Sequence, residues 1–117
     1  MWPFHCQGHP RFRRVDDRVS VTGQIRPEDM PAIARAGFRL LVCARPDGEQ
    51  RGQPDFAALA AVAERLGLTA RHIPVGGQPG PEQAARMRDL LAATGGPVLL
   101  WCRSGARAEA LHRLARE

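Results

Sequence analysis

The segment Cys102–Arg107 reads Cys-Arg-Ser-Gly-Ala-Arg and places a thiol and two cations within six residues. Successive backbone N–H groups in such a loop can curl around an anion, and a helix that starts there adds unpaired donors and partial positive charge. Arg107 can supply two aligned donors to an oxyanion. The same positive field stabilises a thiolate, and a thiolate held beneath a bound oxyanion can attack it.

We therefore interpret Cys102 as a nucleophile and Arg107 as the cation that binds the anion. The predicted substrate-binding residues between them are Arg103, Ser104, Gly105 and Ala106. Gly105 suits a tight loop that requires a positive φ. The alternative is that Cys102 is an inert core residue at a strand end and that the arginines are solvated. The complete order of strand, Cys, Arg, small residue, Gly, small residue, Arg and helix favours the catalytic interpretation.

The elements that must position this loop follow from the hydrophobic pattern. Compact apolar runs at 38–44, 69–75 and 97–101 are typical of buried strands, and a short strand is expected near 19–21. Helical patterns separate these runs, so we predict an α/β fold with a mostly parallel sheet of four or five strands and helices on both faces. Sites in such sheets form beyond the carboxyl ends of the strands. Residues 45–50, 76–80 and 102–107 should therefore share one edge.

Length and composition set broader limits. The 117 residues, 44% hydrophobic and 25% charged, are typical of one globular domain, which we place at 15–117 after an N-terminal extension at 1–14. No apolar run approaches the ~18 residues of a membrane span, and we expect neither a secretory signal nor membrane association. An odd, sparse set of three cysteines argues for a reducing, cytoplasmic location.

The net charge of +5 does not by itself predict a nucleic-acid partner. All 17 basic residues are arginines and they are spread along the chain, as compositional bias would spread them. We expect a small anionic partner instead. Cys6 and His9 have a ligand-like spacing, but a zinc site needs about four ligands, so we predict no metal and no cofactor. The oligomeric state is left open.

Several segments, taken together, resemble a known family. They are ValSerValThrGlyGlnIle (19–25), ArgProAspGlyGlu (45–49), GlnProAspPhe (53–56), HisIleProVal (72–75) and the 102–107 loop. The loop resembles those of the rhodanese and tyrosine-phosphatase superfamilies. The whole set resembles the β-lactamase-hydrolase-like protein phosphatase-like domain family, which is also catalogued among sulfur transferases. Over residues 14–117 this resemblance implies a three-layer phosphatase-like fold, with Cys102 as nucleophile and Arg107 as phosphate binder.

The chain departs from the tyrosine-phosphatase pattern in three ways. Four residues, not five, separate Cys102 from Arg107, which suits a sulfur atom or a compact oxyanion. Residues 76–80 contain no general acid for the leaving oxygen. The nearest acids on the predicted edge are Asp47 and Glu49; we assign Asp47 as the acid, with turn formation as its alternative role. Ala108 also replaces a hydroxyl residue, so Ser104 could steady the thiolate or only cap the helix.

Three functions remain open on these residues. The first is a cysteine-dependent phosphatase-like hydrolase that acts on phosphoesters. The second is a sulfurtransferase that carries a Cys102 persulfide to an accepting partner. The third is a non-catalytic module in which the loop binds an anion or a protein.

Other polar and thiol side chains have weaker claims to a role in the chemistry. We expect His72 to be packed and His112 to be solvated. Cys43 should lie in the core, and it could form a disulfide with an oxidised nucleophile if the two sulfurs are close. Arg45 could enlarge the positive edge or face water.

Overall fold

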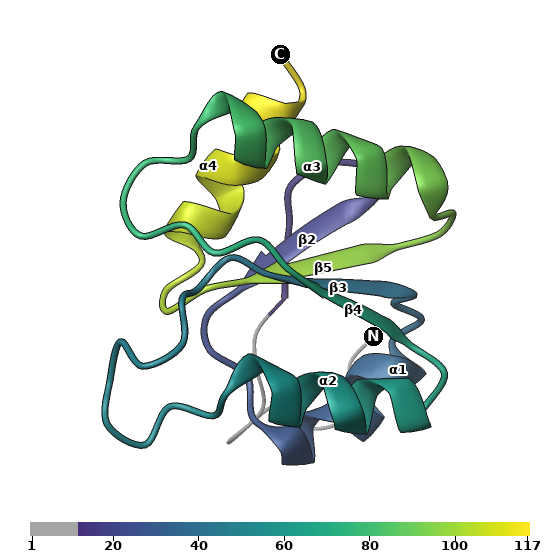
Figure 1. Ribbon diagram of the computed structural model, residues 1–117. Coiled ribbons are helices and arrows are strands. Elements are labelled where there is room, and N and C mark those ends of the chain that lie inside the picture. Colours follow the sequence, from purple (N-terminus) through teal and green to yellow (C-terminus); the bar gives the residue numbers. More distant parts are fainter. Residues whose placement is uncertain (1–11) are drawn as a thin grey trace.

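The computed structural model describes residues 12–117 (Figure 1). These residues form five strands, four α-helices and one short 3-10 helix. In sequence they are β1 (Arg13–Arg14), β2 (Val19–Thr22), η1 (Pro27–Asp29), α1 (Met30–Arg35), β3 (Leu40–Cys43), α2 (Phe56–Arg65), β4 (Thr69–His72), α3 (Pro81–Ala93), β5 (Val98–Trp101) and α4 (Ala106–Ala115). Within this part of the chain no helix is both long and apolar enough to cross a bilayer.

The strands form one sheet in the order β1-β2-β5-β3-β4. Strands β2, β5, β3 and β4 are parallel, and β1 pairs antiparallel with β2 at the edge. This confirms the predicted α/β class with a mostly parallel sheet. Strand β1 lies in the range predicted as an extension, and Cys6 and His9 lie outside the described residues.

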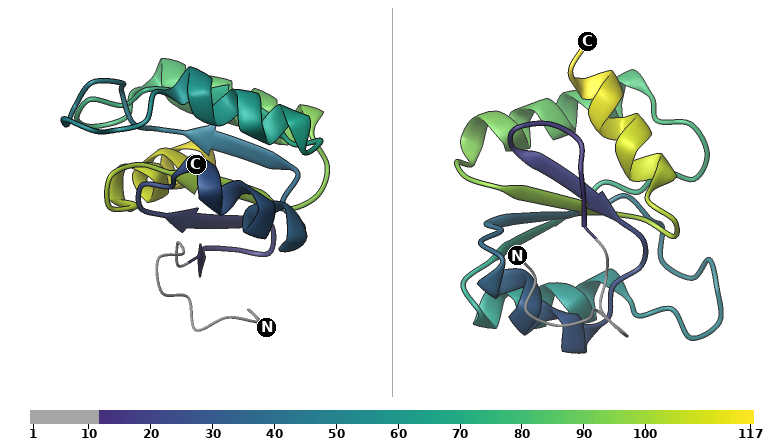
Figure 2. Two further views of the ribbon diagram at one scale, coloured as in Figure 1. Left: turned by 90° about the horizontal axis from the view of Figure 1, so that it is seen from below. Right: turned by 180° about the vertical axis from the view of Figure 1, so that it is seen from behind.

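Helices cover both faces of the sheet (Figures 1 and 2). Helices α3 and α4 lie on one face, and α1 and α2 lie on the other. Strand residues alternate between these layers: Val42 and Leu100 pack with α3 and α4, while Leu41 and Leu99 pack with α1 and α2. Because both faces are buried, the two central strands, β3 and β5, are apolar at every position rather than at every second one.

Strand β5 is central and carries the loop of interest. Its last residue, Trp101, stands opposite Thr22 of β2 and Cys43 of β3. The segments after these strand ends therefore gather at one edge of the sheet, on the left in Figure 1. The contacts between residues 45–50 and 102–107, described below, confirm that these two loops share an edge.

Helix α4 is tied to the turn between β1 and β2 by a buried histidine. His112 is only 2% exposed, and its Nε2 donates to Asp16 Oδ2 at 2.7 Å. Asp16 Oδ1 accepts the N–H groups of Arg18 and Val19. The expectation that His112 is solvated was wrong, because α4 lies against the sheet with this residue facing inward.

Candidate active site

The loop between β5 and α4 closes around the Cys102 sulfur. The N–H of Gly105 donates to Cys102 Sγ at 3.0 Å, and Gly105 has a φ of 98° at the N-cap of α4. That left-handed conformation is costly for residues with a Cβ, so the glycine permits the turn that directs its own amide at the sulfur. The local sequence thus folds as the motif predicted.

The backbone of the loop also offers donors to an anion. Among the described residues, the N–H groups of Arg103, Ser104 and Arg107 donate to no protein acceptor, while Ala106 N–H reaches Ser104 Oγ at 3.4 Å. Unpaired N–H groups at the start of a helix are the ordinary protein ligands of oxyanions. Ser104 therefore contributes to the start of α4 through its hydroxyl.

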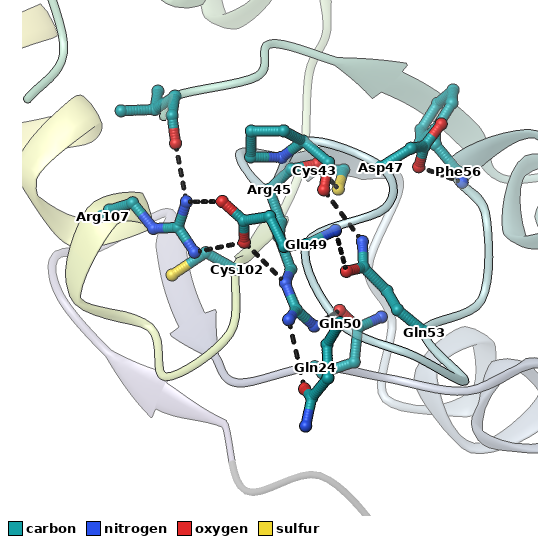
Figure 3. A network of polar contacts seen from close by, with 12 residues as sticks. Gln24, Cys43, Arg45, Asp47, Glu49, Gln50, Gln53, Phe56, Cys102 and Arg107 are labelled. Atoms are coloured by element: carbon teal, nitrogen blue, oxygen red, sulfur yellow. Dashed lines mark hydrogen bonds and ion pairs between the residues drawn. The ribbon is translucent and has the colours of Figure 1, made fainter. Parts of the chain in front are cut away.

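Arg107 is held in a defined orientation beside the sulfur. Its Nη1 donates to Glu49 Oε2 at 2.7 Å and to the Val75 carbonyl at 2.8 Å, and its Nη2 donates to Glu49 Oε1 at 2.8 Å. Figure 3 shows Cys102 beside this guanidinium. Hydrogen bonding to Glu49 is the main cause that raises the pKa of Arg107, and the Cys102 sulfur contributes in the same direction.

The contacts of Arg107 leave one edge of its guanidinium available. A guanidinium has five N–H donors, of which Glu49 and Val75 use three. The two that remain, on Nε and Nη2, share one edge and form the planar fork that matches two oxygens of an oxyanion. Glu49 therefore braces Arg107 and leaves two coplanar donors on its Nε–Nη2 edge, in a guanidinium that also interacts with the Cys102 sulfur.

Glu49 is itself fixed by a second arginine (Figure 3). Arg45 Nε donates to Glu49 Oε1 at 2.9 Å, and the other nitrogens of Arg45 donate to Gln24 and Gln50. Hydrogen bonds from Arg107 and then Arg45 lower the pKa of Glu49 to about 2, although burial opposes this shift. Glu49 is thus an ionised acceptor in this arrangement and is not poised to donate a proton.

Arg45 differs from both expectations for it. The residue is only 1% exposed, so it does not face water, and its charge is balanced by Glu49. Burial of a guanidinium requires paired donors, and Arg45 meets this requirement through one carboxylate and two amide oxygens. It organises the loop after β3 rather than enlarging the positive edge.

The loop after β2 contacts the backbone of the cysteine loop. Gln24 N–H donates to the Arg103 carbonyl at 3.2 Å, and a Cβ placed on Gly23 would lie only 2.9 Å from the same oxygen. The glycine is required by this close approach of two backbones. The end of segment 19–25 therefore packs directly against the backbone of the cysteine loop.

The side chain of Asp47, the predicted acid, is engaged outside this network. Its Oδ1 accepts the N–H of Phe56, the first residue of α2, at 2.8 Å. Within the described chain no hydrogen bond joins Asp47 to Cys102 or Arg107. The observed contact corresponds to the alternative role, in which Asp47 organises the turn after β3 and the start of a helix.

Cys43 and Cys102 have different environments. Cys43 lies in the layer of α1 and α2, whereas Cys102 belongs to the layer of α3 and α4. Both are buried and free. Burial raises the pKa of Cys43 to about 12, and its Sγ donates to the Arg45 carbonyl at 3.3 Å. Side chains on opposite faces of a sheet do not form a disulfide without a large rearrangement, so the structure does not favour that pairing.

His72 occupies a packing role, as its pattern indicates. Its ring stacks on Phe56 with centroids 4.6 Å apart, and Nε2 contacts the Arg45 carbonyl at 2.8 Å. Among residues 12–117, no group of three or more His, Cys, Asp or Glu side chains could hold a metal ion.

A cysteine at the end of a central parallel strand, an amide-lined loop and a braced arginine are the arrangement expected of a phosphatase-like domain. The comparisons with known proteins agree. Residues 11–117 match the family model of the β-lactamase hydrolase-like protein, phosphatase-like domain, and the chain belongs to that family. This confirms the family resemblance found in the sequence.

Individual relatives and solved structures are similar to this chain. It is 35% identical over 106 residues to a β-lactamase hydrolase-like protein of Xylella fastidiosa (strain 9a5c), covering 90% of this chain and 25% of the relative. The chain thus spans about a quarter of the length of the curated relatives it matches. The crystal structure of a candidate phosphatase from Neisseria meningitidis Z2491 is similar, with 32% identity, a TM-score of 0.77, and coverage of 85% of this chain and 71% of that one.

A more distant structure supports the fold alone. Tk-PTP in its active form has a TM-score of 0.65 at 20% identity, with coverage of 99% of this chain and 82% of that chain. The phosphatase-like three-layer fold is therefore confirmed.

Sequence reasoning did not find the pairing of Glu49 with Arg107. The sequence indicates Glu49 only as a possible substitute acid, and Arg45 only as a cation that enlarges the positive edge or faces water. The spacing of four residues between Arg45 and Glu49, directly after a buried strand, was the available signal. The partner 58 positions away could be identified only once the sheet had brought the two loops together.

Proposed function

We propose that this domain is a cysteine-dependent phosphatase that hydrolyses phosphoesters at Cys102. The observation that carries the proposal is the Gly105 amide on the Cys102 sulfur, together with the braced guanidinium of Arg107 beside it. Loop amides and the Nε–Nη2 edge of Arg107 bind the non-bridging phosphoryl oxygens. These donors stabilise the charge that grows on those oxygens during the reaction.

The reaction proceeds in two displacements. The Cys102 thiolate attacks phosphorus, an S–P bond forms, and the ester P–O bond breaks with its electron pair leaving on oxygen, which takes up a proton. Water then attacks the thiophosphoryl group, releases phosphate and restores the thiolate. Cys102 has no exposed surface, so the substrate must displace side chains above the loop to reach Sγ.

A sulfurtransferase is the second candidate, and two observations favour it. The loop has four residues between Cys102 and Arg107, and the two nearby acids are engaged, Glu49 as an ionised partner of Arg107 and Asp47 on Phe56 N–H. In this reaction the thiolate attacks the outer sulfur of thiosulfate, the S–S bond breaks and sulfite leaves. Cyanide or a thiol then removes that sulfur from the Cys102 persulfide.

One paired assay tests both candidates. The protein is given para-nitrophenyl phosphate in one reaction and thiosulfate with cyanide in another, each beside Cys102→Ser and the matched thiol control Cys43→Ala. Phosphate release that is lost only in Cys102→Ser supports the phosphatase, and thiocyanate formation with the same pattern supports the transferase. Inactivity in both reactions, with phosphate still bound, would leave the non-catalytic module and overturn both enzymatic proposals.

A further inference from the structure

A second cationic pocket lies next to the cysteine loop. Its volume is about 340 Å³, within the range of small-ligand sites. The residues that line it are Gln24, Arg26, Arg45, Gln50, Arg51, Gly52, Gln53, Pro54 and Arg103. No acidic side chain is among them, so four arginines and three amides face a common space without a lining carboxylate.

The charge of this pocket is only partly balanced. Arg45 is neutralised by Glu49, and Arg26 has a contact of 3.5 Å with Glu28 on the exposed surface. Arg51 and Arg103 are exposed and their side chains have no ion-pair or hydrogen-bond partner among residues 12–117. Two cations that share one concave space without an acidic partner repel each other, and an anion between them relieves that repulsion.

The polar groups of the pocket are oriented for anion binding. Gln24 and Gln50 use their amide oxygens to accept from Arg45, so these acceptors are turned inward and occupied. The Gln50 Nε2 donor has no acceptor within the described residues. Gln24 Nε2 and Gln53 Nε2 donate to the carbonyls of Ile25 and Pro46, so the donors left for a ligand are those of Gln50 and of the exposed arginines.

The pocket and the cysteine loop are parts of one continuous surface. Arg103, which lines the pocket, directly follows Cys102, and its carbonyl is bonded to Gln24 N–H. Arg45 at the pocket and Arg107 at the loop hold the same Glu49 carboxylate. A molecule whose phosphoester lies over Cys102 can thus extend a second group into the pocket.

We propose that this pocket binds a second anionic group of the substrate, so that the preferred substrates are bisphosphates or phosphoesters that carry a further acidic group. This inference rests on the proposed function for its first anion site, the Cys102 loop. The pocket itself is defined by arginines and amides that the reaction at Cys102 does not use, with Arg103 alone contributing to both sites.

The test uses 1,n-alkanediol bisphosphates with chains of two to eight carbons and the matching alkyl monophosphates. Binding is measured by calorimetry on Cys102→Ser, and competition with para-nitrophenyl phosphate is measured on the active protein. We expect bisphosphates of one favoured length to bind at least 10-fold more tightly than their monophosphates. The calorimetric arm requires no turnover, so it remains informative if the proposed phosphatase activity fails.

Arg51→Gln and Arg65→Gln form the matched pair of variants, made alone and in the Cys102→Ser background. Arg65 is an exposed arginine at the end of α2, outside the pocket, and its substitution changes the net charge equally. Arg51→Gln should reduce the bisphosphate advantage at least 3-fold and leave monophosphate binding unchanged, whereas Arg65→Gln should change neither. No bisphosphate advantage at any length, equal losses in both variants, or no measurable binding would overturn the proposal.

Discussion

The Glu49 carboxylate holds the Nη1–Nη2 edge of the Arg107 guanidinium, which adjoins the Nε–Nη2 edge. Two hydrogen bonds of 2.7 and 2.8 Å join the pair, and Arg45 anchors the same carboxylate at 2.9 Å. Because a guanidinium is planar, fixing its Nη1–Nη2 edge also fixes the direction of its Nε–Nη2 edge. We therefore predict that Glu49 is a positioning residue that acts on catalysis through Arg107.

Substitution of Glu49 should weaken catalysis without removing the nucleophile. In Glu49→Gln the amide has one acceptor oxygen and no charge, so the paired contact with Arg107 is lost. A charge-assisted hydrogen bond contributes about 1.5–3 kcal/mol, so we expect kcat/KM for the aryl phosphate to fall about 10- to 100-fold. Glu64→Gln, on the exposed face of α2, is the control. Equal rates in wild type and Glu49→Gln would show that Arg107 needs no brace.

The close approach at Gly23 should be sensitive to a single methyl group. A Cβ at this position would lie 2.9 Å from the Arg103 carbonyl oxygen, so Gly23→Ala must push the cysteine loop away or distort β2. We expect a loss of about 1–3 kcal/mol in the free energy of unfolding and weaker phosphate binding. Gly76→Ala is the matched control, because nothing lies within 4 Å of its Cβ position. Denaturant melts and phosphate titrations of the two variants check this prediction.

The two possible roles of Asp47, turn formation and general acid catalysis, can be distinguished by the pH dependence of the rate and by the leaving group of the substrate. Asp47→Asn keeps an oxygen that can accept Phe56 N–H, so we expect the fold to persist. If the residue only organises this turn, kcat should change less than about 3-fold for aryl and alkyl phosphates alike, which is the result we expect from its observed contact. A general acid would instead show a large loss for alkyl leaving groups and loss of the alkaline limb of the pH–rate profile. That outcome would support Asp47 as the general acid.

Low pH should weaken the contact between Asp16 and His112 of α4 and so lower the stability of the fold. Burial raises the pKa of Asp16, but hydrogen bonds from His112, Arg18 and Val19 outweigh it and lower the pKa to about 2. A carboxyl group whose pKa is depressed on folding stabilises the protein above its ordinary pKa, near 4. That contribution is lost as the pH falls from about 4 through about 2.

Asp16→Asn tests this contribution directly. We expect the variant to unfold more readily than wild type at pH 7 by about 1–3 kcal/mol, since it loses a charged hydrogen-bond partner of buried His112. The difference between the two proteins should shrink between pH 4 and pH 2. Denaturant titrations across this range measure it. A difference that stays constant with pH would contradict the assigned pKa.

Much of the fold could be predicted from local patterns. Fully apolar runs such as 97–101 indicated strands buried on both faces, and the intervening helical repeats implied a parallel sheet covered on both sides. The cysteine loop was equally readable, because a strand end, Gly105 and a helix start are consecutive in the chain. Their contacts are local, and the Gly105 amide meets the Cys102 sulfur across only three residues.

The tertiary structure decided which distant side chains meet. Arg107 and Glu49 are joined only because the parallel register sets the ends of β3 and β5 side by side. Local spacing could not show that Asp47 would turn to Phe56, that Arg45 would be buried, or that His112 would face Asp16. Hydrophobic periodicity specifies local elements and their buried faces, whereas pairing between polar side chains depends on how separate loops pack in space.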